Sequence, residues 1–245
     1  MGSGFYGFPE EISEFFMGLR LNNNAAWFNE HRDQFERSVR GPMAALIESL
    51  SQTMLEIDPQ VDCRPASAIA RIRRDARYAG NMEPYREHLW FAFRRKGERS
   101  SVIPAYYMGI SLNGVNWGCG FYIAPRSVMD ALRAICLRTP SRVLDVIEDA
   151  VFHERFRLDG TSYKRMAVPA ELDERLRSIW KMKDIYAERS AALSCAQTPL
   201  FSDMLSDDFR ALAPFYKLLR DATDAASGSE AERIMRVDTT NKSPA

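Results

Sequence analysis

The 245-residue sequence lacks a charge imbalance and is poor in histidine and cysteine. Lysine plus arginine number 33, as do aspartate plus glutamate, which argues against a dedicated DNA coat or polyanion-binding protein. The four cysteines form no C-x-x-C pair and the three histidines are dispersed, so the sequence does not support a zinc finger or an iron–sulfur site. Cysteines without such spacing fit a reducing compartment.

The sequence also lacks a secretory leader and a membrane span. Residues 1–9 have neither a basic start nor an apolar core. Residues 100–125 carry no charge, but the proline, glycines and asparagines among them would not be placed in a helix in lipid. We therefore expect a soluble, cytoplasmic protein without a membrane partner.

Common catalytic signatures are absent from the sequence as well. It contains no G-x-S-x-G nucleophile elbow, no Walker lysine and no H-E-x-x-H zinc helix. It therefore names no reaction and no cofactor, predicts no metal ligands, and leaves open whether the protein is an enzyme.

The spacing of apolar residues predicts an α+β fold of helices, then sheet, then helices. Helical periodicity runs from Pro9 to Leu19, from Ala25 to Phe35, and after Gly41-Pro42 as far as Leu55. After Pro125, further helices are predicted over residues 128–136, 143–151, 169–189 and 208–220.

The middle third predicts an antiparallel sheet with helices packed over it. Residues 68–74 and 89–95 are predicted strands, followed by strands over residues 106–112 and 115–122. The last two flank Asn113-Gly114, a strong hairpin signal because both residue types tolerate positive φ. Residues 1–223 are thus predicted to form one domain. Residues 224–245, which lack aromatics and are rich in polar residues, are predicted to be a disordered tail.

Positive charge is concentrated in residues 71–99, which we call the arginine block. This block holds nine basic residues against four acidic ones, a net charge of +5 in an otherwise neutral chain. The guanidinium group presents a rigid set of donors that matches carboxylate and phosphate oxygens. The block is therefore the best candidate for a functional site.

Two interpretations of the block remain open. In the first, a small molecule bearing phosphate or carboxylate binds there. Its predicted ligand-binding residues are Arg71, Arg73, Arg77, Arg86, Tyr85 and, across the hairpin, Trp117. In the second, nearby acids close an internal ion-pair network.

His88 is the histidine nearest the block. With an unperturbed pKa of about 6.5, it could transfer a proton if the ligand is a substrate, with Asp75 orienting it. An alternative is nucleic-acid binding, with the arginines on phosphates and Tyr78, Tyr85 or Trp90 stacking on bases. A third hypothesis is that the block receives an acidic segment of a protein partner.

Several strings of the sequence resemble one bacterial family, the conserved hypothetical proteins of domain of unknown function 2461. The strings are N-N-N-A-A-W-F (residues 22–28), R-I-R-R-D-A-R-Y (71–78), P-Y-R-E-H (84–88), G-C-G (118–120) and Y-K-R (163–165). The resemblance extends from Phe8 to about Arg220. It implies a single domain and points to the arginine block, but it brings no established activity.

The sequence departs from the family pattern inside the block. Asn81 and Met82 stand where the family has aspartate and lysine, and Arg86 replaces a lysine. If the family lysine performs chemistry, the resemblance implies that this member has lost that step or acts on a different substrate.

Overall fold

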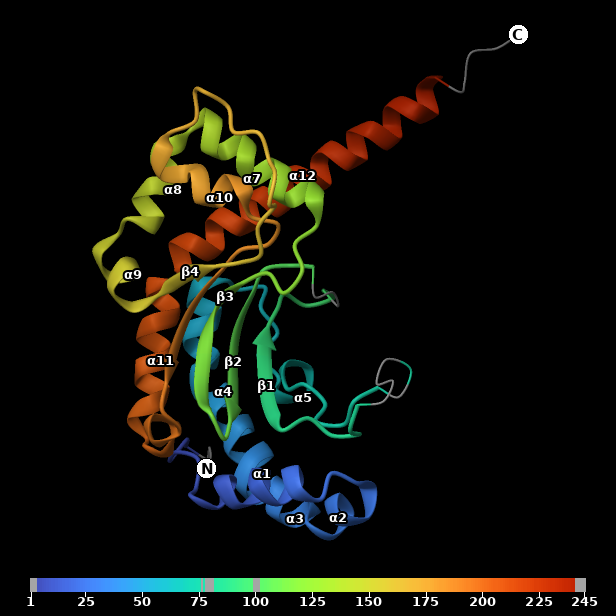
Figure 1. Ribbon diagram of the computed structural model, residues 1–245, viewed down its shortest axis with the longest axis vertical. Helices are drawn as coiled ribbons and strands as arrows, with labels where there is room; N and C mark the ends of the chain where they lie inside the picture. Colours follow the sequence, from blue (N-terminus) through green and yellow to red (C-terminus); the bar gives the residue numbers. More distant parts are fainter. Residues whose placement is uncertain (1–3, 76, 78–81, 99–101, 241–245) are drawn as a thin grey trace. The chain divides into compact units, whose positions relative to one another are not determined.

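A computed structural model describes residues 4–75, 77, 82–98 and 102–240, with side chains as far as residue 228 (Figure 1). The N-terminal helices are α1 (Glu11–Leu21), α2 (Ala25–Glu30), α3 (Arg32–Phe35), the π-helix η1 (Glu36–Arg40), α4 (Gly41–Ile57) and α5 (Pro65–Ala68). The strands are β1 (His88–Phe93), β2 (Ala105–Ser111), β3 (Gly114–Gly120), β4 (Arg157–Asp159) and β5 (Tyr186–Ala191). The remaining helices are α7 (Arg126–Arg138), α8 (Pro140–Ile147), α9 (Ala150–Arg155), η2 (Glu174–Leu176), α10 (Arg177–Lys181), η3 (Leu193–Gln197), α11 (Leu200–Ala211) and α12 (Ala213–Thr240).

The strands form one five-stranded sheet in the order β1-β2-β3-β5-β4. β1 and β2 are antiparallel, with Trp90 opposite Gly109 and Ala92 opposite Tyr107. Helices precede and follow the sheet in the chain, so the predicted α+β class is confirmed. Within the described residues, no helix is both long and apolar enough to cross a membrane.

The chain divides into two compact units, each built from separate segments. The first contains the described residues of Met1–Glu98, Ala105–Gly118 and Glu188–Ala211. The second contains those of Arg99–Pro104, Cys119–Ala187 and Leu212–Ala245. The arginine block falls almost entirely in the first unit.

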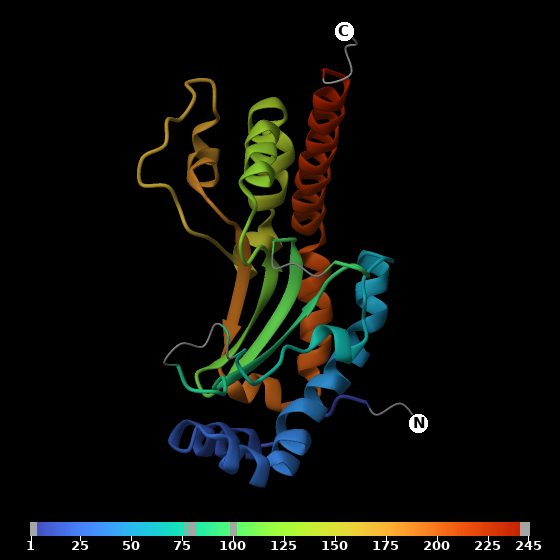
Figure 2. The same cartoon turned by 90° about the vertical axis from the view of Figure 1, so that its right-hand side faces the viewer.

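The core of the first unit lies between its strands and the helices α4 and α11, which lie on the same side of the sheet (Figures 1 and 2). Phe209 of α11 contacts Phe93 of β1 and Tyr106 of β2, and Trp117 of β3 meets Phe201 of α11 edge to face. We call the opposite side of the sheet its outer face. Because side chains alternate along a strand, the neighbours of these core residues lie on the outer face.

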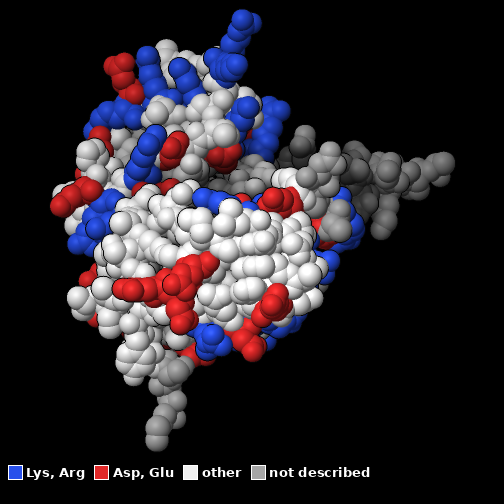
Figure 3. Space-filling view, turned by 60° about the horizontal axis from the view of Figure 1, so that its bottom comes forward, with Lys and Arg blue, Asp and Glu red and all other residues white. Residues whose placement is uncertain are grey.

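The helices α1 to α3 form one end of the first unit. Phe15 of α1 packs against Trp27 and Phe28 of α2 and Phe35 of α3, forming an aromatic cluster. Figure 3 looks onto this end and shows a broad uncharged surface with groups of acidic side chains. This surface therefore has little to attract an anion.

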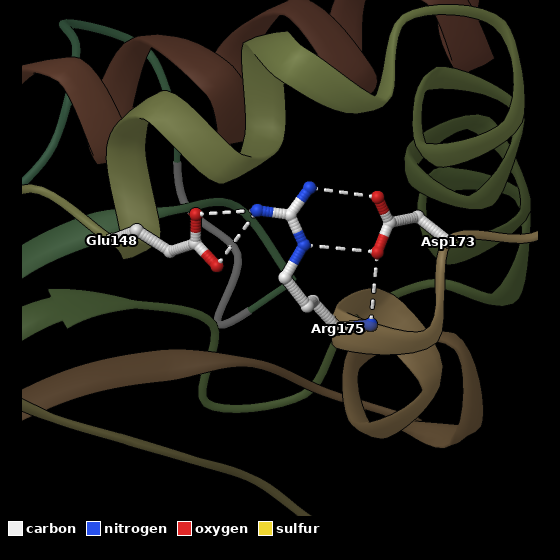
Figure 4. A network of polar contacts seen from close by, with 3 residues as sticks. All are labelled: Glu148, Asp173 and Arg175. Atoms are coloured by element: carbon white, nitrogen blue, oxygen red, sulfur yellow. Dashed lines mark hydrogen bonds and ion pairs between the residues drawn. The ribbon is translucent and has the colours of Figure 1, made fainter.

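Arginines tie together parts of the second unit. Arg133 of α7 is 5% exposed and donates to the backbone oxygens of Trp180 and Met182. Arg175 holds two carboxylates, donating Nη1 to Glu148 and Nε and Nη2 to Asp173 (Figure 4). These bonds fasten the segment around η2 and α10, which is short of regular structure.

The hairpin is confirmed, although its turn differs in detail. β2 and β3 flank Leu112 and Asn113, and Gly114 is the residue with positive φ, at 123°. Asn113 keeps a negative φ. A Cβ at Gly114 would lie 2.4 Å from the backbone oxygen of Ala191, so glycine is required here for conformation and for space.

Several predicted elements are wrong. The helices predicted over residues 25–35 and 208–220 are each divided, the first into α2 and α3 and the second between α11 and α12. Residues 68–74 are not a continuous strand, because Ala68 ends α5 and only Ile69 and Arg73 form isolated bridges. Residues 169–189 are not one helix: η2 and α10 are short, and β5 follows because its residues pair within the sheet. The helix over 143–151 is divided into α8 and α9, since Asp149 caps the start of α9 through the amides of Val151 and Phe152.

α12 continues to Thr240, through most of the segment whose composition predicts disorder. Residues 241–245 of that tail lie outside the described part of the chain.

Candidate functional site

The arginine-rich segment lies beside the strand that follows it. Ile69 forms an antiparallel bridge with Phe91, and Arg73 forms one with Tyr85. Three residues (70–72) lie between Ile69 and Arg73, whereas five residues (86–90) lie between their partners Tyr85 and Phe91. The surplus makes the second segment bulge, and bulges redirect side chains away from the regular alternation.

Arg86 supports the backbone at this bulge. Its Nη1 donates to the backbone oxygens of Arg71, at 2.8 Å, and Arg73, at 3.2 Å. Its own amide donates to the oxygen of Ile72. An arginine side chain thus takes the place of strand amides that the irregular pairing cannot supply, and this fixes the segment that carries Arg71 and Arg73.

Asn23, in the connection between α1 and α2, holds the other side of the bulge. Its Nδ2 donates to the backbone oxygen of Tyr85 and its Oδ1 accepts from the amide of Tyr85, both at 3.0 Å. The Tyr85 ring is buried and stacks on Phe28, with 4.3 Å between ring centroids. Tyr85 therefore anchors the segment through its buried ring, which is not accessible to a ligand.

Replacing Asn23 by alanine is expected to lower the free energy of unfolding by about 2 kcal/mol, because two hydrogen bonds to backbone groups are lost at about 1 kcal/mol each. Urea unfolding measures this change. The control is Asn29→Ala, an exposed residue whose Oδ1 accepts from the nearby Arg32. Equal effects of the two changes would contradict the anchoring role.

Several cations of the block already have partners. Arg77 forms a bidentate pair with Asp75, and Arg95 pairs with the buried Asp58. Glu87 pairs instead with Arg20 of α1. Arg77 holds the pKa of Asp75 below its usual range, with a smaller contribution from Arg71.

Three arginines of the block have neither an ion pair nor a side-chain hydrogen bond among the described residues, whereas Arg86 and Arg94 donate to backbone oxygens. Arg71 and Arg73 are exposed, and Arg74 is half-buried. The Nε of Arg74 is buried without a hydrogen-bond partner among these residues. A buried donor without an acceptor is unfavourable, so this segment is where a bound anion would be most stabilising.

His88 begins β1 beside these arginines. It is exposed at the surface, yet its pKa lies below the ordinary value of 6.5, first because surrounding protein removes water and second because Arg86 and Arg74 repel a proton. A neutral imidazole at pH 7 can accept a proton. The hydrogen bonds of Asp75 go to Arg77 and not to His88.

The structure brings Arg71, Arg73, Arg86 and His88 together but places Trp117 elsewhere. The Trp117 ring is fully buried, and its Nε1 donates to Asp208 at 2.8 Å. It therefore belongs to the core under the sheet, and we leave it out of the site. Tyr78 and Asn81 lie outside the described residues.

Two contributors were not among the predicted site residues. Arg74 lies within the block, but the sequence cannot show which guanidinium group lacks a partner. Arg20 lies 67 positions from Glu87, and nothing in the sequence links them. Among the described residues, no group of three or more histidine, cysteine or acidic side chains could hold a metal ion.

The molecule is thus an α+β protein whose sheet edge carries a fixed, incompletely neutralised arginine segment. Its chain belongs to the family described as "Conserved hypothetical protein (DUF2461)", whose model matches residues 11–218. The predicted family membership is confirmed. No curated protein matches the sequence.

Proposed function

We propose that this protein binds a small anionic molecule, bearing phosphate or carboxylate groups, at Arg71, Arg73 and Arg74. The observation that carries the proposal is that these arginines have no ion-pair partner among the described residues, while Arg86 and Asn23 fix the backbone around them. A pre-organised backbone lowers the entropy cost of binding. Arg77 can join them by exchanging Asp75 for the ligand, since both side chains are exposed.

If the ligand is a substrate, His88 is the group proposed for proton transfer. It is neutral at pH 7 and stands next to the cations that would bind the anion. Asp75 would orient it only after release from Arg77, because Arg77 occupies both carboxylate oxygens.

Isothermal titration of the full chain with inorganic pyrophosphate and with citrate tests the proposal. We expect the double variant Arg71→Ala/Arg73→Ala to bind at least about tenfold more weakly, since hydrogen bonds to charged groups contribute about 1.5–3 kcal/mol each. Its melting temperature should be nearly unchanged, because both side chains are exposed and have no ion pair among the described residues. The matched control is Arg37→Ala, an exposed arginine of η1.

A strongly destabilised double variant would instead assign these arginines to an internal ion-pair network. A third titration uses a single-stranded oligonucleotide. If the oligonucleotide binds more tightly than either small anion, and its affinity falls steeply with salt, the site is for nucleic acid.

The titration of His88 provides a second readout of the same site. The pKa of His88 is below 6.5 in the folded chain, so as the pH falls the unfolded chain protonates this imidazole before the folded chain does. His88 therefore lowers the free energy of unfolding as the pH falls below 6.5 toward the folded-state pKa. A bound anion offsets Arg86 and Arg74, and saturating pyrophosphate should raise the pKa of His88 in histidine NMR spectra. His153, in α9, serves as the reference. An unchanged His88 pKa in a saturated complex would place the anion elsewhere.

A further inference from the structure

A row of polar and aromatic residues crosses the outer face of the sheet in the first unit. It comprises Trp90 on β1, Tyr107 and Gly109 on β2, Asn116 on β3 and Glu188 on β5. Trp90 is paired directly with Gly109. The adjacent residues Phe91 and Trp117 are buried and Arg189 reaches the buried Asp208, so the row lies on the side of the sheet away from α11. We call these five residues the sheet-face row.

The carboxylate of Glu188 is held in one orientation. Tyr107 Oη and Asn116 Nδ2 both donate to the same oxygen, Oε2, at 2.9 Å each. Among the described residues, no donor approaches the other oxygen, Oε1. Glu188 is thus a positioned carboxylate with one oxygen still able to accept hydrogen bonds.

The orientation of the Asn116 amide follows from that of Glu188. A carboxylate only accepts, so the nitrogen of the amide must face Glu188 and its oxygen must face the other way. The oxygen, Oδ1, lies over Gly109, where a Cβ would come within 2.8 Å of it. It has no donor among the described residues, so a second open acceptor borders the space above Gly109.

Gly109 keeps this space open beside an exposed aromatic ring. A Cβ on Gly109 would meet Asn116 on one side and the Cβ of Trp90, at 3.8 Å, on the other. Trp90 is 37% exposed, so part of its side chain is accessible to a ligand. The backbone at Gly109 does not have a positive φ, so glycine is needed here for space alone.

We propose that the sheet-face row binds an organic cation, a primary ammonium or guanidinium group, at the open acceptors of Glu188 and Asn116 beside Trp90. The open atoms of Glu188 and Asn116 are acceptors, which suits a group carrying several N–H donors and no acceptor. The negative charge of Glu188 favours a cation over a neutral donor. The indole ring attracts a cation further through its quadrupole. This site is separate from the arginine segment and of opposite charge, and it does not depend on the function proposed above.

Fluorine NMR of the full chain labelled with 5-fluorotryptophan tests the site. The four tryptophans give separate signals, and Trp90→Phe identifies that of Trp90. The probes are methylguanidinium, n-butylammonium and methylurea, the last an uncharged analogue of the first. We expect both cations to shift the Trp90 signal saturably and methylurea to leave it unchanged.

Two variants test the site, one by removing its charge and the other by filling its space. Glu188→Gln keeps the shape and should weaken cation binding at least about tenfold, because the ion pair between carboxylate and cation is replaced by a hydrogen bond to an uncharged amide. Gly109→Ala fills the space and should weaken it similarly, while the Asn116 side chain can turn aside and leave the fold intact. The control is Glu48→Gln, an exposed carboxylate on α4, which should bind as the unchanged chain does.

The signals of Trp27, Trp117 and Trp180 report in the same spectra whether each variant is folded. Methylurea binding as well as methylguanidinium would overturn the inference of a cation site. So would the absence of a saturable shift, or equal affinity in Glu188→Gln, Gly109→Ala and Glu48→Gln.

Discussion

Replacing Asp208 by alanine is expected to lower the free energy of unfolding by about 3–5 kcal/mol, the cost of breaking a buried charge pair. Asp208 of α11 is fully buried, and its carboxylate accepts from Arg189 Nη1, at 2.9 Å, and from Trp117 Nε1, at 2.8 Å. Alanine would leave a guanidinium and an indole N–H without this acceptor beneath the sheet. Both donors are tied to strands β3 and β5, so the loss weakens the attachment of α11 to the sheet.

The adjacent residue provides the control. The side chain of Asp207 is 72% exposed and lies 3.7 Å from Arg210, so Asp207→Ala should cost less than about 1 kcal/mol. Urea unfolding of both variants, followed by tryptophan fluorescence, measures the difference. A cost for Asp208→Ala as small as that for Asp207→Ala would show that water or other groups replace the carboxylate.

Replacing Arg133 by methionine is expected to destabilise the second unit by about 3 kcal/mol, since buried carbonyl groups lose charged donors. Nε donates to the oxygen of Trp180 at 2.9 Å and Nη2 to that of Met182 at 2.6 Å. Methionine keeps the aliphatic part of the side chain but cannot donate. Trp180 and Met182, at the end of α10, would then lose these two hydrogen bonds to α7.

Hydrogen exchange measured on peptides from α7 and α10 would locate this effect. Exchange in both should accelerate in Arg133→Met, while Arg138→Met, an exposed position on the same helix, should exchange like the unchanged chain. Protection of α10 that is unaltered in Arg133→Met would mean that these hydrogen bonds contribute little to its stability.

Local signals in the sequence predicted local structure well. The prediction of the hairpin uses the neighbouring residues Asn113 and Gly114, and the buried stripe of α4 follows from apolar residues three and four positions apart. The family resemblance and the α+β class were also within reach of the sequence. In each case, neighbours in the chain carry the information.

The errors occurred where distant partners decide the structure. β5 is a strand because residues 186–191 pair within the sheet, although the preceding residues have helical spacing. The segment after α5 follows an irregular course because a bulge and the Arg86 side chain replace a regular ladder. Neither partner can be recognised from local periodicity.

The sites divide in the same way. Counting charges located the arginine block, because its residues are close together in the sequence. The sheet-face row could not be predicted from the sequence, because Glu188 lies 72 residues from Asn116 and 81 residues from Tyr107. No local pattern links Asn23 to Tyr85, 62 residues away, whose backbone it holds. Only the folded chain shows these combinations.

The segmented course of the chain has a consequence for its synthesis. The first unit includes residues 188–211, so it cannot be completed until most of the 245 residues have left the ribosome. At about 5–20 residues per second, the residues between Glu98 and Ala211 take roughly 6–23 s to follow, and part of the core of the first segment stays uncovered for that time. Neither unit can be produced by shortening the chain from one end. During translation the nascent chain is therefore a natural client for chaperones that shield apolar surface.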